Sequence, residues 1–343
     1  MDLKSMTLSE LEDYMESIGE KKFRAKQMYE WMHKRLAFSL EEMNNIPKKM
    51  KEKIENTSEI YGVKMLDCFV SKLDGTRKYL FELHDGNVIE SVLMKYKHGN
   101  SVCISSQAGC RMGCRFCAST LGGLDRNLEP SEMLSQIYYI QKDTGERVSN
   151  VVMMGTGEPM DNFFNVLRFL ELITSEQGLH ISQRNLTIST CGIVPKIKEL
   201  AARHLQITLA ISLHSPNDEM RKELMPIANK YSMDELLDAC RYYFKETNRR
   251  MTFEYSLVAG VNDQPRHAME LCRRLGSFPC HVNLIPVNPI KERNFKQSLP
   301  ESVNKFKKIL EKNRVNVTIR REMGADINAA CGQLRRKKLQ SKI

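Results

Sequence analysis

The sequence has no long apolar run. None of its 343 residues belongs to a stretch that approaches the roughly 18 consecutive apolar residues of a membrane-spanning helix. The first residues, Met1-Asp2-Leu3-Lys4, do not lead into the apolar region of a signal peptide, and no internal repeat or low-complexity segment is present. These absences predict a cytoplasmic protein with no membrane partner. The chain is long enough for one barrel-sized domain and a small appendage.

The sequence also lacks a second C-x2-C pair, which a structural zinc site commonly uses. It does have ten cysteines, and without a secretion signal these indicate metal or redox chemistry in place of a disulfide framework. Three of them, Cys110, Cys114 and Cys117, are spaced C-x3-C-x2-C. Closed electron-transfer clusters use four cysteine ligands, whereas three thiolates on a short loop can bind three irons of a four-iron cluster and leave the fourth open. The spacing therefore predicts one [4Fe-4S] cluster, with a zinc site as the alternative.

This cysteine spacing resembles that of the radical S-adenosylmethionine (radical SAM) superfamily. In those enzymes the amino and carboxylate groups of SAM occupy the open iron. The resemblance implies SAM as a second cofactor.

Residues 1–60 are expected to be helical. Thr7-Leu-Ser-Glu10 and Ser39-Leu-Glu-Glu42 both have the form of a capping box, and Pro47 suits the first turn of a following helix. The second helix is expected over 22–35. Together these signals predict a helical accessory domain.

Basic charge is concentrated in this helical region, within a formal net charge of +10 for the chain. The helix that follows Pro47 carries four lysines: Lys48, Lys49, Lys51 and Lys53. A solvated helical cap would explain any one of them, but their concentration favours a surface that faces nucleic-acid phosphates.

From residue 63 the period of the apolar positions changes. Segments 63–72, 78–83 and 88–94 alternate loosely between apolar and polar residues and are separated by Asp74-Gly75 and Asp85-Gly86, which predicts a three-stranded meander. Glu90 lies in the last of these strands. The alternation alone would make it a surface carboxylate.

From residue 101 strand and helix signals alternate. We expect strands at 102–107, 150–154, 185–190, 206–213, 252–258 and 281–287, and helices at 130–142, 164–175, 195–203, 232–246, 264–275 and 300–313. A strand at 315–319 follows the last helix. Such repeats predict an α/β fold, a partial (β/α)6 TIM-like barrel whose active residues lie at the carboxyl ends of the strands. The expected domains are 1–60 (basic, helical, RNA-binding), 61–100 (meander), 101–335 (radical SAM core) and 336–343 (basic tail).

Polar side chains follow several of these strands. Gly155-Thr-Gly157-Glu158-Pro159 follows the second, and Glu158 offers an acceptor to the amino group of SAM, while glycine allows close backbone approach to a ligand. The turn lacks the GxGxxG spacing of a dinucleotide site. Later strand ends supply further SAM-contact candidates: Ser189, Ser212, Leu213, His214 and Asn288.

Two cysteines outside the cluster loop are also candidates. Cys103 lies in the first strand of the barrel. Cys331 lies in Ala329-Ala-Cys331-Gly332-Gln333, where small neighbours would leave its sulfur accessible. A small buried hydrophobic role is the alternative for either cysteine.

The combined motifs resemble the dual-specificity RNA (adenine-C2)-methyltransferases of the radical SAM superfamily. They are Ile104-Ser-Ser-Gln-Ala-Gly-Cys110, Cys114-Arg-Phe-Cys117, Gly157-Glu158-Pro159, Ile211-Ser-Leu-His214, Leu224-Met-Pro-Ile227 and Ala329-Ala-Cys331-Gly-Gln333. The resemblance implies methylation of adenine C2 in 23S rRNA and in tRNA beside the anticodon. It also implies two SAM molecules per turnover, an external electron donor and a thiol reductant.

The resemblance further implies a role for individual residues. Cys331 would carry an S-methyl intermediate. Cys103 would take the ring proton and then form a disulfide with Cys331, and Glu90 aligns with a glutamate that the family assigns as proton acceptor. The residues do not decide whether Glu90 or Cys103 is the base.

Three other functions stay open at this point. One is the related chloramphenicol–florfenicol resistance type, which methylates C8 of the same rRNA adenine; Pro159 favours C2. The second is a non-catalytic iron–sulfur protein that binds RNA or senses redox state. The third is a radical SAM enzyme acting on a small molecule or peptide, which would have no use for the basic helices.

Overall fold

The computed structural model describes residues 1–276, 278–288 and 294–329. At the centre of this part lies a ten-stranded sheet in the order β1-β2-β3-β4-β7-β8-β9-β10-β11-β12. Its strands are β1 (Lys64–Val70), β2 (Arg77–Glu82), β3 (Val88–Tyr96), β4 (Gly99–Cys103), β7 (Val148–Met153), β8 (Leu186–Thr190), β9 (Thr208–Ser212), β10 (Met251–Leu257), β11 (Cys280–Pro286) and β12 (Asn316–Ile319). Neighbours from β1 to β4 are antiparallel, and neighbours from β4 to β12 are parallel.

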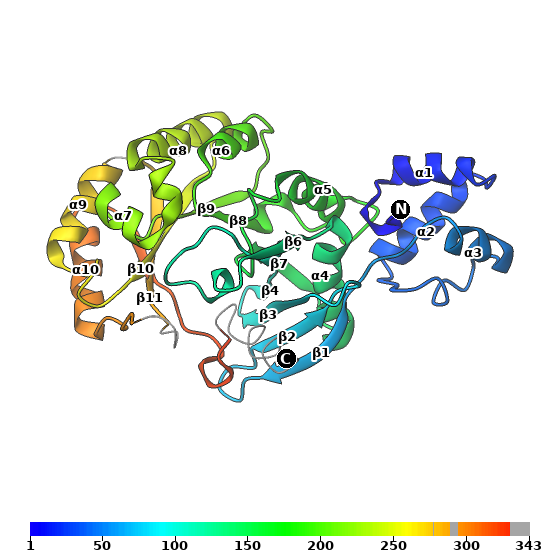
Figure 1. The fold of residues 1–343 in the computed structure, drawn as a ribbon, viewed down its shortest axis with the longest axis horizontal. Coiled ribbons are helices and arrows are strands. Elements are labelled where there is room, and N and C mark those ends of the chain that lie inside the picture. Colours follow the sequence, from blue (N-terminus) through cyan, green and yellow to red (C-terminus); the bar gives the residue numbers. More distant parts are fainter. Residues whose placement is uncertain (277, 289–293, 330–343) are drawn as a thin grey trace.

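Helices follow the parallel strands and lie around the outside of the curved sheet (Figure 1). They are α4 (Pro130–Thr144), α5 (Phe163–Thr174), α6 (Val194–Ala201), α7 (Asp218–Leu224), α8 (Met233–Thr247), α9 (Pro265–Leu275) and α10 (Pro300–Lys312). The expected open α/β barrel is confirmed, with β12 as a final strand after six strand–helix units. The short α7 was not predicted.

Strand β10 illustrates how the sheet directs its side chains. Phe253, Tyr255 and Leu257 are fully buried, and the Tyr255 ring lies 5.2 Å, centroid to centroid, from Phe306 of α10. The alternate residues Glu254 and Ser256 line the pocket on the other face. Because successive side chains of a strand point to opposite faces, one strand supplies both the core and the site.

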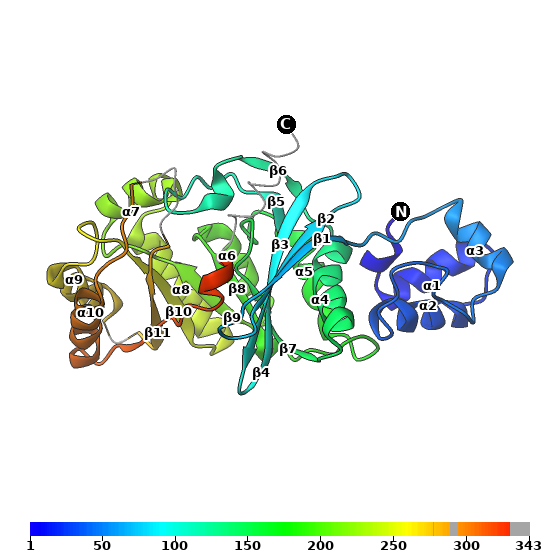
Figure 2. The ribbon, with the colours of Figure 1, turned by 90° about the horizontal axis from the view of Figure 1, so that it is seen from below.

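The first helices form a separate group beside α4 and α5 (Figures 1 and 2). They are α1 (Leu8–Ser17), α2 (Phe23–His33) and α3 (Lys48–Glu55). The His33 Nδ1 lies 2.9 Å from the Tyr138 hydroxyl of α4, and Arg168 of α5 pairs with Glu10 of α1 at 2.6 Å. A buried hydrogen bond and an ion pair therefore connect this group to the barrel.

The two predicted capping boxes have different outcomes. Thr7 caps α1 as expected, with the reciprocal Thr7–Glu10 hydrogen bonds of a capping box. The prediction at 39–42 was wrong, because no helix follows it. The Glu42 carboxylate instead accepts a hydrogen bond from the Phe38 amide and pairs with Lys142 of α4, so it is used in a tertiary contact.

The meander is confirmed as three antiparallel strands, but it is continuous with the barrel. Strand β3 pairs with β4, which sets Val92 opposite Cys103. The surface position suggested for Glu90 was wrong: its side chain is 2% exposed and lies 2.9 Å from the buried Lys78 ammonium. The strand buries both faces here, so its alternation did not mark a solvent side.

The strand expected at 102–107 was also wrong in extent. Strand β4 ends at Cys103, and the chain crosses to a small two-stranded sheet of β5 (Gln107–Gly109) and β6 (Leu124–Asn127), with the cysteine loop between them.

No helix among the described residues is both long and apolar enough to cross a membrane. The expected domain boundaries and the cytoplasmic location stay predictions.

Candidate active site

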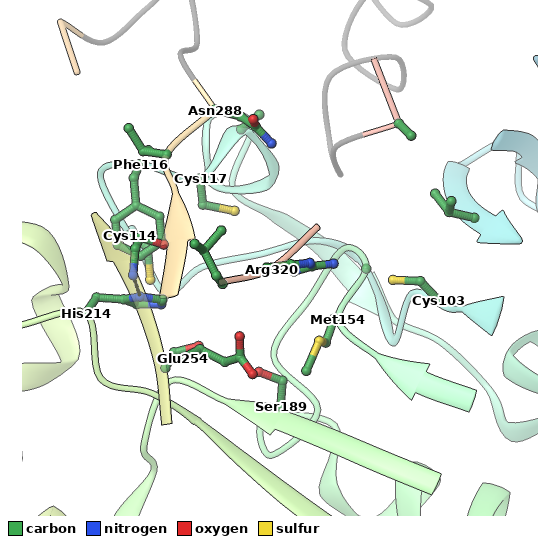
Figure 3. Close-up of a pocket in the computed structure, with 18 of the residues that line it drawn as sticks. Cys103, Cys114, Phe116, Cys117, Met154, Ser189, His214, Glu254, Asn288 and Arg320 are labelled. Carbon is green, nitrogen blue, oxygen red and sulfur yellow. Dashed lines mark hydrogen bonds between the residues drawn. The ribbon is translucent and has the colours of Figure 1, made fainter. Parts of the chain in front are cut away.

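A cavity of about 510 Å³ lies at the carboxyl ends of the parallel strands. It is lined by the cysteine loop, by the ends of β4 and β7–β11, and by residues 320–325 and 328–329 after β12. In Figure 3, Cys114 and Cys117 lie on one side of this pocket and Cys103 on the other, with Arg320 between them. The predicted residues that line it are Cys103, Cys110, Cys114, Cys117, Gly157, Glu158, Ser189, Ser212, His214 and Asn288.

Three predicted residues are placed differently. Glu90 and Leu213 are buried but are not among the residues that line the pocket in the described part of the chain. Leu213 contributes its backbone: its N–H donates to the Glu254 carbonyl, and its own carbonyl accepts from the Arg221 Nε. Cys331 lies outside the described residues.

The cysteine loop is fixed by hydrogen bonds to its own backbone and to α7. The Cys110 amide donates to the Gly123 carbonyl at 2.7 Å, and the Thr120 hydroxyl donates to the Cys114 and Cys117 carbonyls. The Arg115 amide donates to the Leu224 carbonyl at 2.9 Å. Because backbone groups are held on both sides of the loop, the thiols are presented from a rigid frame.

The three thiols share an electrostatic environment. Burial, together with the charges of the neighbouring Cys117 and Glu158, raises the pKa of Cys110 to about 12. Burial raises the pKa of Cys114 well above its usual range, again with contributions from the other two thiols. Thiolates this close repel one another, so a cation must be bound for all three to ionise together.

These thiols fit a four-iron cluster. The fully buried Arg221 lowers the pKa of Cys114 by its charge, and its Nη1 has no hydrogen-bond partner among the described residues. A buried cation beside three thiols suits an anionic cluster. Arg221 was not predicted as a site residue, because the helix that carries it, α7, was not predicted either.

The glycine turn after β7 is packed against the chain itself. Gly157 has φ +111°, and a Cβ there would lie 2.6 Å from the Gln107 Cβ; a Cβ on Gly155 would lie 2.6 Å from the Ile104 carbonyl oxygen. The glycines also allow close approach of the loop that leads from β4 to the cysteines. Both line the pocket, and their contact with a ligand stays a prediction.

Glu158 is held in the pocket wall by two backbone donors. Its carboxylate accepts from the Met160 amide at 3.0 Å and from the Cys191 amide at 2.7 Å. Burial raises its pKa, although these hydrogen bonds oppose the shift. A fixed carboxylate at the pocket surface can accept a hydrogen bond from an ammonium group.

His214 is a rigid, neutral member of the rim. Its Nδ1 accepts from the Ser256 amide at 2.9 Å, which assigns the ring proton to Nε2. Burial, together with the charge of Arg221, lowers its pKa to about 3. The ring of Phe116, which lies between two cluster cysteines in the sequence, packs edge-on against it with centroids 4.6 Å apart.

Glu254 and Arg320 are charged pocket residues that were not predicted. Glu254 of β10 is buried, burial raises its pKa, and it accepts from the Asn283 amide group at 2.9 Å. Arg320 follows β12 and extends across the pocket in Figure 3. The sequence offered one signal for Glu254. A carboxylate between the apolar Phe253 and Tyr255, in a strand expected to be buried on both faces, indicates a buried functional charge.

On the far side of the pocket Cys103 belongs to a small apolar cluster. Cys103, Val92, Met94 and Ala329 are all buried and pack together. These residues come from β4, β3 and the segment that leads to Cys331. The cluster therefore places Ala329, which precedes Cys331 by two residues, against Cys103.

Two family models match this chain. The "Radical SAM superfamily" model matches residues 104–272, and the "Ribosomal RNA large subunit methyltransferase N-terminal domain" model matches residues 1–60. The first match contains the cysteine loop and the strand ends from β7 to β10. The second contains α1, α2 and α3.

Similar proteins extend over almost the whole chain. A probable dual-specificity RNA methyltransferase RlmN from Lachnospira eligens is 63% identical over 339 residues, which cover 99% of this chain and 97% of the relative. A protein of the same name from Lachnoclostridium phytofermentans is 61% identical over 336 residues, covering 98% and 94%. A solved radical SAM methyltransferase from Sphaerobacter thermophilus has a TM-score of 0.93 at 40% identity and covers 97% of this chain and 98% of its own.

Proposed function

This chain belongs to the dual-specificity RNA methyltransferases of the radical SAM superfamily, as its motifs predicted, and on that premise we propose that it forms 2-methyladenine in 23S rRNA and in tRNA. The proposed target positions are the adenine of the peptidyl-transferase centre and the adenine next to the anticodon. One observation carries the proposal furthest. Cys103 lines the same pocket as the three cluster cysteines and packs against Ala329, two residues before Cys331.

The chemistry of adenine C2 explains why a radical source and a methyl carrier are both proposed. C2 of adenine is an electron-poor amidine carbon, so it does not attack the sulfonium methyl group of SAM. A carbon radical that adds to the ring avoids this barrier. The chain must therefore hold both a radical source and a methyl carrier near one base.

The cluster cysteines and the strand ends serve the first need. Cys110, Cys114 and Cys117 would hold the [4Fe-4S] cluster, which when bound supplies the electron that cleaves SAM to methionine and a 5′-deoxyadenosyl radical. Glu158 accepts a hydrogen bond from the amino group of SAM. The remaining proposed SAM contacts are Gly157, Ser189, Ser212, the Leu213 backbone, His214, Asn288 and, from the geometry, Glu254.

Cys331 serves the second need. Its thiolate attacks the methyl group of one SAM; the new S–C bond forms as the sulfonium C–S bond breaks and S-adenosylhomocysteine leaves. This S-methyl group then gives up a hydrogen atom to the 5′-deoxyadenosyl radical, which becomes 5′-deoxyadenosine, and its methylene carbon bonds to C2 of the adenine. Two SAM molecules are used in each turnover.

Release of the product requires Cys103. The ring proton at C2 passes to a base, for which Cys103 and Glu90 are the two candidates. The bond between the methylene carbon and the Cys331 sulfur breaks, the Cys103 and Cys331 sulfurs join as a disulfide, and the electron released would be taken up by the cluster that Cys110, Cys114 and Cys117 would hold. The methylene carbon takes up a proton to become the methyl group, and an external thiol reductant resets the two cysteines.

The basic helices are proposed to bind the RNA phosphates. Lys48 and Lys49 are exposed on α3, while Met50 and Ile54 of the same helix are buried. The lysines therefore face away from the core. An external electron donor completes the proposed partners, and the proposed location is the cytoplasm.

The product tests the proposal directly. The cluster-loaded protein is incubated anaerobically with a 23S rRNA transcript, SAM and a reductant, and the digested RNA is analysed by mass spectrometry. We expect 2-methyladenosine together with 5′-deoxyadenosine. Formation of 8-methyladenosine would assign the protein to the C8 type, and absence of 5′-deoxyadenosine would exclude radical chemistry.

A further inference from the structure

The turn between β1 and β2 receives a segment from the other end of the chain. The Asp326 carboxylate accepts from the Ser71 hydroxyl at 2.6 Å and from the Lys72 amide at 2.9 Å. The Gly324 amide donates to the Asp74 carboxylate at 2.9 Å. Both ribbon views place this red segment beside the end of the β1–β2 hairpin (Figures 1 and 2).

A buried cation adds a fourth hydrogen bond a short distance along the hairpin. The Lys78 ammonium donates to the Asn328 carbonyl at 3.0 Å and lies 2.9 Å from the Glu90 carboxylate. The side chains of Lys78 and Glu90 are 0% and 2% exposed. The donor of the hydrogen bond to Asn328 is therefore a buried cation, which makes this bond stronger than one between two exposed groups.

The segment itself is folded tightly onto the hairpin. Gly324 has φ +61°, and a Cβ there would lie 2.7 Å from the Ala329 Cβ and 3.0 Å from the Thr76 Cγ2. The Ala329 amide donates back to the Gly324 carbonyl at 3.1 Å. Burial of the Asp74 carboxylate opposes its ionisation, but the Gly324 and Thr76 donors outweigh it and lower its pKa to about 2.

This arrangement fixes the point from which the chain continues to Cys331. Ala329 is buried against Cys103, Val92 and Met94. Two residues of fully extended chain span at most about 7 Å. A segment held at Ala329 therefore limits how far the sulfur of Cys331 can move from Cys103.

We propose that the β1–β2 hairpin is an internal docking site for segment 324–329 and thereby positions Cys331 against Cys103. Asp74, Ser71 and Lys78 are positioning residues in this arrangement, because they hold the segment and do not touch the reacting atoms. The inference rests on the proposed function, which assigns Cys331 as the methyl carrier. It adds that the hairpin controls the encounter of the two thiols.

The test removes the two carboxylates at the half-exposed tip of the hairpin, and with them the three hydrogen bonds that they accept between the hairpin and segment 324–329. We compare the double variant Asp74→Ala/Asp326→Ala with Asp67→Ala, which removes an exposed carboxylate of β1 that accepts a hydrogen bond from the adjacent Cys68 amide. The cluster-loaded proteins are treated anaerobically with diamide, which takes two electrons and two protons as a Cys103–Cys331 disulfide forms. Peptide mapping under non-reducing conditions gives the rate of that disulfide.

We expect disulfide formation and RNA methylation to slow roughly 10- to 100-fold in the double variant, since misplacing a reacting group by about 1 Å can cost 10²-fold. Cluster absorbance and the midpoint of thermal unfolding should match those of Asp67→Ala, which separates positioning from stability. Equal disulfide and methylation rates in the two variants would overturn the docking inference.

A second variant tests the same docking by a different route. Gly324→Ala added to the double variant would place a Cβ 2.7 Å from the Ala329 Cβ and 3.0 Å from the Thr76 Cγ2, which forces the segment away from the hairpin. Failure of the proposed function gives a different result: the unaltered protein would then methylate no adenine and carry no S-methyl group on Cys331. An active unaltered protein with an equally active triple variant rejects only the docking site.

Discussion

Lys78 and Glu90 face each other across the neighbouring strands β2 and β3 as a buried ion pair, with their charged atoms 2.9 Å apart. Residues 78 and 90 are not directly paired; in the β2–β3 register Lys78 lies opposite Val92, and Glu90 lies opposite Leu80. The side chains therefore meet diagonally. This pair connects a proposed proton acceptor to the segment that precedes Cys331.

Replacing Lys78 with Met should lower the free energy of unfolding by about 3–5 kcal/mol, because it leaves the Glu90 charge buried without its cation. The double variant Lys78→Met/Glu90→Gln should recover much of that loss, since no buried charge remains. Urea unfolding measures both. Equal losses in the single and double variants would show that the ion pair does not account for the effect.

Cys331→Ala should abolish RNA methylation, because no thiolate remains to take the methyl group from SAM. Cluster absorbance should not change, since the three cluster cysteines are untouched. Radioactive methyl transfer to RNA and to protein gives the measurement. Cys272→Ala is a suitable control, because Cys272 is a buried thiol on α9 that does not line the pocket. Normal turnover of Cys331→Ala would refute the proposed mechanism.

Cys103→Ala should accumulate protein covalently bound to RNA, because the adduct can form but its sulfur cannot be displaced. A nuclease-sensitive band of higher mass in denaturing gels, absent without SAM, would identify it. The substitution is mild for packing, since Cys103 lies beside the small Ala329 in its apolar cluster. If no adduct appears and methylation continues, Cys103 has only a packing role.

Neutralising Lys48, Lys49 and Lys51 as glutamines should weaken RNA binding and flatten its salt dependence. Each lost phosphate contact lowers the slope of log K against log salt by about 0.7–0.9, so the slope should fall by roughly 2 to 3. The control replaces Lys305, Lys308 and Lys312, exposed lysines of α10 at the opposite end of the molecule (Figure 1). Identical slopes for the two triple variants would mean that α3 does not bind RNA.

Acid should weaken the attachment of the N-terminal helices. Burial, with the charge of Lys4, lowers the pKa of His33 to about 3 from 6.5, so the folded protein binds fewer protons than the unfolded chain between these values. Stability that is fully present above pH 6.5 is therefore lost as the pH falls towards 3, by on the order of a few kcal/mol.

His33→Gln should reduce this acid-side loss, because glutamine does not titrate and can still form a hydrogen bond with Tyr138. Unfolding by urea at pH 7 and pH 5 gives the difference in stability for each protein. His98→Gln is the control, since His98 is exposed in the turn between β3 and β4. The same pH dependence in both variants would assign the acid sensitivity to other groups, of which His214 is the first.

The alternation of strands and helices was predictable because it is a local property. The apolar runs at β7 to β11 and the Thr7 capping box depend on residues a few positions apart, and these predictions agree with the structure. The box at 39–42 failed because a distant lysine, Lys142, uses the Glu42 carboxylate. A local sequence pattern cannot show that a residue a hundred positions away will bind the carboxylate.

The same distinction separates the site residues. The three cluster cysteines are marked by their spacing, so they could be found from the sequence. Glu254 and Lys78 are single charges in strands, and their burial depends on which strands lie beside them. Gly157 was predicted as a site residue, but its close packing against Gln107 was not, because the neighbours of a glycine depend on the tertiary structure.

Docking of segment 324–329 onto a hairpin about 250 residues earlier has a consequence for the order of synthesis. A ribosome that has made the chain as far as β12 has already made all three cluster cysteines, the glycine turn and the strand ends. The contacts between the hairpin and segment 324–329 can form only after that segment has left the ribosome. Closing such a long loop is also among the slower events in folding. A chain truncated before residue 320 would thus keep every residue proposed to generate a radical and lose the thiol proposed to receive it.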